Sequence, residues 1–215
     1  MNIRSGGNLF LIIAFILLSG CAEQKNNSNE VKIISLHDVP TVTYDIRYAT
    51  ENNFTGKQIY PMPGVFLVEP AAKALLDVVH DLNQRGLSIR IFDAYRPLSA
   101  QRKLWEIHPD PTFVADPATG SRHNRGAAID LTLTDLNGDP LAMPTDYDEF
   151  TEAASHDYED LPDSVVQNRE LLRSVMETHG FEALNSEWWH YDYQGWEEFP
   201  VLDKDFEELI KKHSK

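Results

Sequence analysis

The spacing of apolar residues predicts several helices in the chain. Between Glu69 and Arg85, apolar positions recur at helical intervals, with Pro70 at the start and Gly86 just past the end. Proline at the first turn and glycine after the last one are typical helix boundaries, so this segment is predicted to be helical. The other helices predicted in this way, in chain order, cover Leu98–Ile107, Asp163–Gly180, with Gly180 as its C-terminal stop, and Asp205–Lys212.

Strict alternation of apolar and other residues predicts a strand over Ala127–Leu133. Its aliphatic side chains share one face, and Asp130 lies on the opposite face, away from the predicted core. Asn137-Gly138 is a typical hairpin turn and predicts a short return of the chain through Leu141. The other predicted strands cover Val31–Leu36, Thr41–Ala49, Leu87–Phe92 and Ser186–Tyr193.

Helices and strands are mixed along the chain without a regular strand–helix–strand repeat, and at least one hairpin joins sequential strands. This order predicts an α+β fold with a central, mostly antiparallel sheet flanked by helices. A length of 215 residues, with 42% hydrophobic and 25% charged residues, fits a single folded domain, which we place at residues 31–215.

The N-terminus has a different pattern, with an unbroken apolar run over Leu9–Leu18 that ends in the sequence Leu18-Ser19-Gly20-Cys21. The run is too short to span a bilayer and has the length of a signal peptide. The pattern resembles a bacterial lipoprotein signal, which implies removal of residues 1–20, lipidation of Cys21 and a tether through residue 30. A plain secretory signal or an N-terminal anchor helix are the alternatives.

The lipoprotein resemblance implies a periplasmic or other extracytoplasmic protein held to the membrane by its lipid. Ala22 after the cysteine, in place of an aspartate, favours sorting to an outer membrane. Cys21 is the only cysteine, so an internal disulfide and a cysteine-based catalytic mechanism are both excluded. The net charge of −15 repels nucleic acid and anionic lipid, so we expect no nucleic-acid partner and membrane contact only through the anchor.

Two histidines stand beside carboxylates at suggestive spacings. His123 precedes Asp130 by seven residues, and His190 follows Glu187 by three. Two imidazoles and one carboxylate suit a catalytic zinc ion, with Glu187 as a general base. Taken alone, each of these short patterns is weak evidence for a metal site and more often belongs to an ordinary loop or strand. For the other histidines a surface or capping role is expected: His37, His80, His108, His156, His179 and His213.

A regular strand does not place residues i and i+3 on one face. If Glu187 and His190 both face a metal, the chain must therefore bulge or turn between them, with Trp188 and Trp189 packing around the turn.

The motifs together resemble a known family. "SRHNRGAAIDLTL" and "EWWHY" are similar to the S-x-H-x-x-G-x-A-x-D and E-x-W-H motifs of zinc D-alanyl-D-alanine dipeptidases of the vancomycin-resistance type. Three more segments extend the resemblance over residues 38–200, in the same order: "RYATENNFTGK", "FDAYRP" and "RELLRSVMETHGFEALNSEWWHY".

The resemblance implies a zinc site on the sheet and a role for each matching residue. His123, Asp130 and His190 are implied as zinc ligands, and Glu187 as the group that activates water and protonates the leaving amine. The remaining implied residues are Arg96 for the oxyanion, Ser121 and Tyr48 for substrate contact, and Asp148 for the substrate ammonium. Structural alternatives are a loop salt bridge for Arg96, a loop cap for Ser121 and core packing for Tyr48.

The implied activity is hydrolysis of the small dipeptide D-Ala-D-Ala to two D-alanines, in cell-wall turnover or D-alanine scavenging. A D,D- or L,D-carboxypeptidase that trims peptidoglycan stem peptides is the nearest alternative. A non-catalytic wall-binding lipoprotein is the alternative from another class, although such binders typically lose a ligand or the base, and this chain keeps the full set of matching residues.

Overall fold

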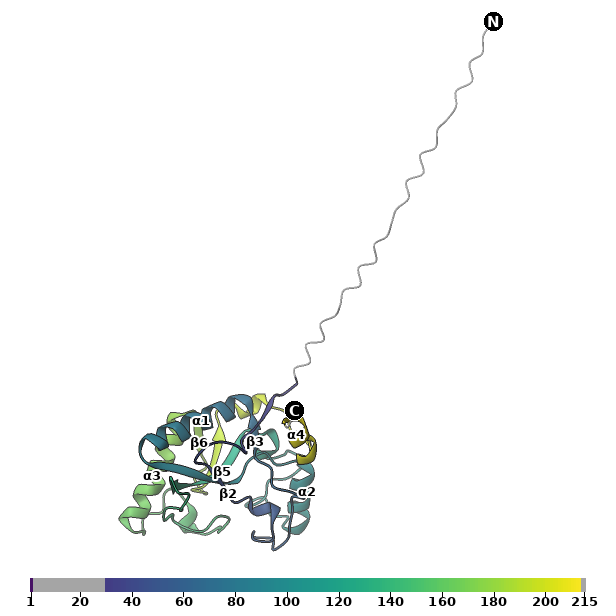
Figure 1. The fold of residues 1–215 in the computed structure, drawn as a ribbon. Helices are drawn as coiled ribbons and strands as arrows, with labels where there is room; N and C mark the ends of the chain where they lie inside the picture. The colour runs from purple at the N-terminus through teal and green to yellow at the C-terminus, as the bar shows by residue number, and fades with distance from the viewer. Residues whose placement is uncertain (2–29, 214–215) are drawn as a thin grey trace. The chain divides into compact units, whose positions relative to one another are not determined.

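The structure is a computed structural model that describes Met1 and residues 30–213. The predicted signal sequence, Cys21 and nearly all of the predicted tether lie outside the described residues. From Val31 onward the chain forms one compact unit, with helices packed around a central sheet (Figure 1). In the part of the chain that is described, no helix combines the length and apolar character needed to cross a bilayer.

The central sheet has five strands in the order β2-β4-β5-β7-β6. β2 runs parallel to β4, and every other neighbouring pair is antiparallel, so the predicted mixed fold with a largely antiparallel sheet is confirmed. A separate antiparallel pair joins β1 to β3. The strand bounds are β1 Ile33–Ser35, β2 Thr43–Tyr44, β3 Phe66–Val68, β4 Leu87–Asp93, β5 Ala128–Asp135, β6 Phe181–Ala183 and β7 His190–Tyr193.

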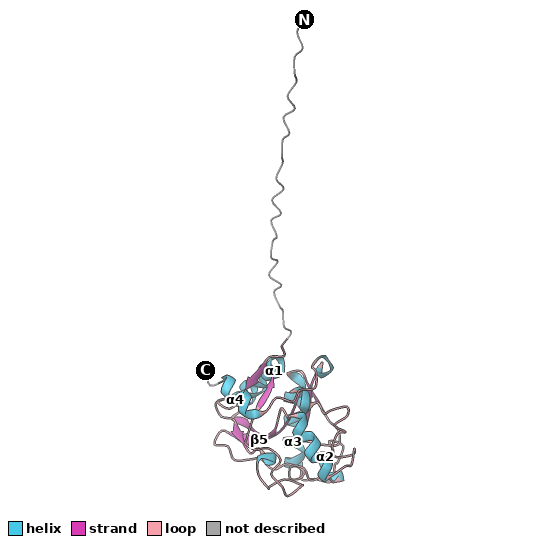
Figure 2. Ribbon diagram, turned by 90° about the vertical axis from the view of Figure 1, so that its right-hand side faces the viewer, coloured by secondary structure: helices cyan, strands magenta, loops and turns pink. Residues whose placement is uncertain are grey.

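The helices agree closely with the apolar spacing of the sequence. Their bounds are α1 Glu69–Gln84, α2 Leu98–Ile107, α3 Asp163–Thr178 and α4 Phe206–His213. α1 and α3 contact each other and pack on the central sheet, whereas α2 and α4 lie on the side of the domain away from α3 in Figure 1. Figure 2 shows the same helices, in cyan, from a second direction. Pro70 lies in the first turn of α1, and Gly180 follows α3 with a positive φ of 85°, as their sequence positions predicted.

The two faces of β5 separate the aliphatic core from the side on which functional residues can lie. Ile129, Leu131 and Leu133 are fully buried in the core, and Asp130 lies on the opposite face, as predicted. That opposite face is not open to water, because Asp130 and Thr132 are each only 3% exposed. The irregular segment that contains Tyr147 contacts this face, because the Tyr147 hydroxyl donates a hydrogen bond of 2.9 Å to Asp130 Oδ2. The predicted hairpin return runs beside β5, and its Leu141 amide donates a hydrogen bond of 3.0 Å to the Leu133 carbonyl.

Three predicted strands are shorter than expected. Within Val31–Leu36 only Ile33–Ser35 forms a strand. Within Thr41–Ala49 only β2 is extended, and a 3₁₀ helix follows at Arg47–Ala49. The carbonyl of Tyr48 accepts hydrogen bonds from the amides of Ile59 and Tyr60, so contacts with a later segment bend the chain there. Within Ser186–Tyr193, only β7 is a strand, and the preceding residues form a turn.

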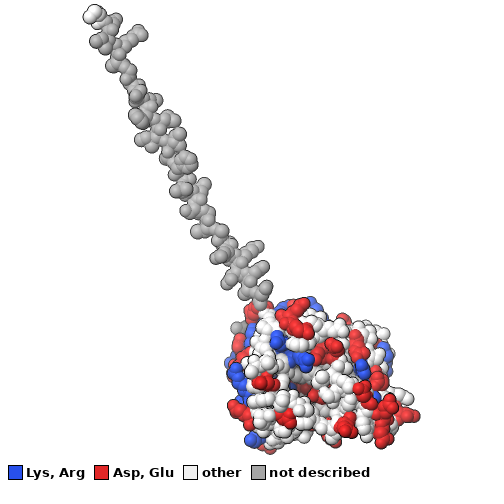
Figure 3. All heavy atoms as spheres, turned by 180° about the vertical axis from the view of Figure 1, so that it is seen from behind, with Lys and Arg blue, Asp and Glu red and all other residues white. Residues whose placement is uncertain are grey.

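The surface of the protein exposes both acidic and basic side chains, and acidic residues outnumber basic ones in the sequence. Acidic and basic side chains are interspersed on the face shown in Figure 3, among uncharged residues that cover most of it.

Candidate active site

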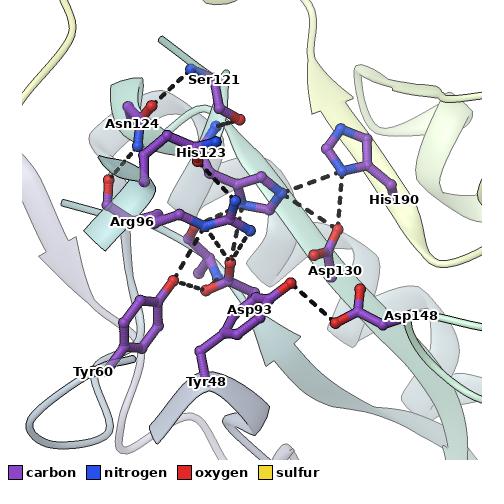
Figure 4. Close-up of polar contacts among 12 residues, drawn as sticks. Tyr48, Tyr60, Asp93, Arg96, Ser121, His123, Asn124, Asp130, Asp148 and His190 are labelled. Atoms are coloured by element: carbon purple, nitrogen blue, oxygen red, sulfur yellow. Dashed lines mark hydrogen bonds and ion pairs between the residues drawn. The ribbon is translucent and has the colours of Figure 1, made fainter. Parts of the chain in front are cut away.

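Three buried donor side chains converge where β5 meets β7. Asp130 and His190 lie directly opposite each other in the antiparallel register, so both side chains emerge on the same face. His123 comes from a 3₁₀ turn, His123–Arg125, just before β5. His123 Nε2 lies 3.2 Å from His190 Nδ1 and 3.4 Å from Asp130 Oδ1, and His190 Nδ1 lies 2.9 Å from the same oxygen (Figure 4).

Gly126 allows the turn that carries His123 to end against β3. Its φ of 67° is left-handed, and its carbonyl accepts a hydrogen bond of 2.9 Å from the Val68 amide. A Cβ atom at this position would lie 3.3 Å from that amide nitrogen. A residue with a side chain would therefore be strained both in its backbone and by this close approach.

The outer ring nitrogen of each histidine is held by a second group. His123 Nδ1 lies 2.7 Å from the Ala94 carbonyl, and His190 Nε2 lies 3.0 Å from Asp192 Oδ1. These oxygens accept hydrogen bonds from the outer N–H groups, so His123 Nε2 and His190 Nδ1 are the ring nitrogens that face Asp130. Such anchoring of the outer ring nitrogen is the usual support of a metal-binding histidine.

The charges of the cluster also suit a cation. Burial opposes ionisation of Asp130, but the adjacent His123 and His190 hold the pKa of this carboxyl well below its ordinary value. Burial lowers the pKa of His190, yet the carboxylates of Asp130 and Asp192 raise it well above its ordinary value overall. The cluster therefore attracts positive charge, and two imidazoles with one carboxylate fit the donor set of a catalytic zinc ion.

Glu187 lies in the turn that precedes β7. Its amide donates to the Leu184 carbonyl, and its own carbonyl accepts a hydrogen bond of 3.1 Å from the His190 amide, so the chain turns between the two residues as predicted. Trp188 and Trp189 are buried beside the turn. Glu187 lines the same cavity as the three donors, and burial raises the pKa of its carboxyl.

Arg96 is buried and held by an ion pair. Asp93 Oδ2 accepts hydrogen bonds from Nε at 3.1 Å and Nη2 at 2.6 Å, and Gln101 Oε1 accepts one from Nη1 at 2.8 Å. The Tyr60 hydroxyl also lies 3.3 Å from Nε. Each Nη atom carries a further N–H, and Arg96 lines the cavity. Arg96 therefore forms a salt bridge with Asp93 and also lies in the candidate active site.

Tyr48, Asp148 and Ser121 line the same cavity, which has a volume of about 430 Å³. The Tyr48 hydroxyl donates a hydrogen bond of 3.0 Å to Asp148 Oδ2. Burial, and then the charge of Asp130, raise the pKa of the Asp148 carboxyl well above its ordinary value. Ser121 Oγ accepts a hydrogen bond of 3.2 Å from the His123 amide, so it also caps the loop.

Several polar residues of the site were not assigned a role from the sequence: Asp93, Gln101, Tyr147 and Asp192. Asp192 has a recognisable sequence position, because residues i and i+2 of a strand share a face and it follows His190 by two. Asp93 belongs to the "FDAYRP" motif and precedes Arg96 by three residues. Gln101 and Tyr147 reach the site only through the tertiary fold.

His156 departs from the expected surface role. It is only 3% exposed, and neither ring nitrogen has a hydrogen-bond partner among the described residues. Its amide donates a hydrogen bond of 2.8 Å to the Asn185 carbonyl, which braces the segment leading to Glu187. Burial, and then the charges of Arg173 and Arg169, lower the pKa of His156 from 6.5 to about 4.

This lowered pKa predicts a pH-dependent stability. Between pH 6.5 and pH 4 the unfolded chain binds a proton at His156 that the folded protein does not, so the free energy of unfolding falls as the pH falls. We expect a loss of roughly 2–3 kcal/mol attributable to this residue across that window. His156→Leu should remove this share of the pH dependence in urea unfolding curves. Parallel pH profiles of the two proteins would contradict the prediction, because titrations common to both cancel in the comparison.

The buried His–Asp–His cluster on a sheet, with a glutamate in the same cavity, defines the class of zinc metallohydrolases. A family model described as D-ala-D-ala dipeptidase matches residues 29–212. The chain belongs to this family, and the predicted family resemblance is confirmed.

Curated relatives carry the same family name. The chain is 38% identical over 167 residues to the D-alanyl-D-alanine dipeptidase of Escherichia coli K12, and the match covers 78% of this chain and 86% of that protein. It is 33% identical over 171 residues to the D-alanyl-D-alanine dipeptidase of Enterococcus faecium, covering 70% and 85%.

Solved structures with some similarity include a mutant of the vancomycin resistance D,D-pentapeptidase VanY in complex with Zn(II). This similarity has a TM-score of 0.41 and 17% identity, and it covers 62% of this chain and 76% of that chain.

Proposed function

We propose that the protein hydrolyses the dipeptide D-Ala-D-Ala to two D-alanines as a zinc-dependent enzyme. The observation that carries this proposal is the convergence in one cavity of three metal donors, a glutamate, an arginine and an aspartate. Membership of the D-Ala-D-Ala dipeptidase family supports the choice of substrate.

The positions of the three metal donors define the end of the cavity at which we place the reaction. We assign the metal to His123 Nε2, His190 Nδ1 and the Asp130 carboxylate. Bound zinc would supply Lewis acidity toward the scissile carbonyl and toward water. Asp192 and the Ala94 carbonyl keep the outer nitrogens protonated, so the inner nitrogens stay available as ligands.

Glu187 is assigned the proton transfers. Its carboxylate takes a proton from the attacking water and then delivers that proton to the amine of the departing D-alanine. The raised pKa of this buried carboxyl brings it closer to the working pH, which favours a group that must both accept and release a proton. The free Nη hydrogens of Arg96 are assigned to the oxygen that gains charge as the carbonyl is attacked.

We assign to Asp148 the role of binding the ammonium group of the substrate. In the absence of substrate its carboxyl is buried beside the charge of Asp130, which raises its pKa. An ammonium group supplies the opposite charge and favours ionisation, so binding and charge pairing occur together. Tyr48 orients Asp148 through its hydroxyl, and Ser121 offers its own hydroxyl from the cavity wall.

Zinc analysis combined with D-alanine release tests the function. The purified protein should contain one zinc per chain and release two D-alanines from each D-Ala-D-Ala. Preferential release of terminal D-alanine from a pentapeptide stem would instead assign a carboxypeptidase. Binding of wall peptides without any turnover would assign a recognition module.

For the location, we propose that lipidation at Cys21 anchors the protein outside the cytoplasm, with the outer membrane as its destination. The apolar run and the Leu-Ser-Gly-Cys ending support this proposal, and they favour wall turnover or D-alanine scavenging as the setting. Labelled palmitate should mark the wild-type protein and not the Cys21→Ser variant. A secreted wild-type protein that carries no label would refute the anchor.

A further inference from the structure

The hydroxyl of Tyr147 reaches the metal donor Asp130 from outside the sheet. It donates a hydrogen bond of 2.9 Å to Asp130 Oδ2, whereas Oδ1 of the same carboxylate faces His123 and His190. The two oxygens of Asp130 thus have different partners, since Oδ2 is hydrogen-bonded to Tyr147 and Oδ1 faces the histidines. Removing the hydroxyl would leave Oδ2 without this donor in a buried environment.

Packing fixes the ring of Tyr147 in place. The ring is stacked on Phe92 with centroids 4.7 Å apart, and it meets Trp189 edge-on at 5.6 Å. Tyr147 is only 6% exposed, so its hydroxyl is shielded from water and donates its hydrogen bond to Asp130.

The next residue, Asp148, faces the substrate side of the cavity. Its φ of 61° is left-handed, which is uncommon for a residue other than glycine and indicates that surrounding contacts hold the backbone there. Its side chain accepts a hydrogen bond from Tyr48 on a different segment (Figure 4). Adjacent residues of one loop thus contact a metal donor and the proposed ammonium anchor.

We propose that Tyr147 is a positioning residue that couples the metal to the loop at residues 145–150. It orients Asp130 for the metal, and the metal in turn holds the loop in the conformation that presents Asp148. The claim about substrate anchoring rests on the proposed function, because it uses the role assigned to Asp148. Since binding equilibria are linked, the same contact makes a substrate held by Asp148 strengthen metal binding.

A pair of Tyr→Phe variants tests the proposal. Tyr147→Phe removes the bonded hydroxyl. Tyr191→Phe is the matched control, because Tyr191 is also buried, lies next to His190, and has a hydroxyl without a hydrogen-bond partner among the described residues. Competition with a chromophoric chelator should show about 10-fold weaker zinc binding in Tyr147→Phe, the lower end of what loss of a supporting contact costs. Tyr191→Phe should bind zinc like the wild type.

Hydrogen exchange measures the coupling directly. In the full-length wild type, zinc should slow amide exchange in residues 145–150, and this protection should shrink in Tyr147→Phe but persist in Tyr191→Phe. Zinc affinity within about twofold of the wild type in Tyr147→Phe, or equal zinc-dependent protection in both variants, would overturn the proposal. A change of equal size in both variants would do the same, because it would reflect general loosening.

Neither measurement requires substrate, so this inference and the proposed function fail separately. A wild-type protein that releases no D-alanine refutes the function, while zinc affinity and exchange still decide whether Tyr147 couples metal and loop. If the wild type is active, zinc-saturated Tyr147→Phe should show a raised KM with a smaller change in kcat, because the displaced loop carries the ammonium anchor. A changed kcat with an unchanged KM would remove the claim about substrate anchoring.

Discussion

Glu187→Gln is expected to retain zinc and to lose nearly all turnover, with kcat reduced by about 10³-fold. Glutamine has the shape of the protonated acid but can neither accept a proton from water nor return it to the leaving amine. Removal of a general acid–base group typically costs about 10²–10⁴-fold in rate. Glu187 stands apart from the three metal donors, so metal content should not change. Stopped assays of D-alanine release and metal analysis of the same sample measure the two effects.

Glu182→Gln is the matched control for this prediction. Glu182 is an exposed glutamate on β6, five residues before Glu187, and it does not line the cavity. Its substitution removes the same charge from the same part of the chain, so activity should remain near the wild-type value. A Glu187→Gln protein with normal turnover would show that another group carries the proton.

His123→Ala is expected to lose both zinc and activity. The substitution deletes one of three donors and leaves the buried carboxylate of Asp130 with fewer partners. Its effect on zinc affinity should exceed the roughly 10–100-fold that is typical when only a supporting contact is lost. Because a ligand that binds only the folded state stabilises it, added zinc should raise the Tm of the wild type and have little effect on the variant.

His80→Ala provides the comparison for this second prediction. His80 is exposed on α1, and its ring contacts only Gln84 among the hydrogen bonds observed in the described part of the chain. This variant should keep the zinc-dependent rise in Tm and the activity. Stoichiometric zinc in purified His123→Ala would remove His123 from the proposed ligand set.

The elements most fully predicted from the sequence are those that local physics controls. The spacing of apolar residues placed α1 and α2 within a residue of their observed bounds, and the alternation in β5 correctly turned Asp130 away from the aliphatic core. β3 and β6 were not predicted, because three residues are too few to show a period.

The sequence predicted which residues form the site better than it predicted how they are arranged. The family motifs named the cluster, but spacing could not show that Asp130 and His190 lie opposite each other, since that depends on the register of β5 and β7. The burial of His156 was missed for a similar reason. A histidine in a loop is expected to be exposed until the segment that covers it is known.

The sequence by itself determined the helices, the two faces of β5 and the family, because each follows from residues close together or from ordered motifs. Only the tertiary structure decided that Arg96 is shared between Asp93 and the cavity, that Glu187 lies in a turn, and that Tyr147 reaches Asp130. These contacts join residues from separate elements. Their energies depend on burial and on distances of a few ångströms, which the order of residues along the chain does not specify.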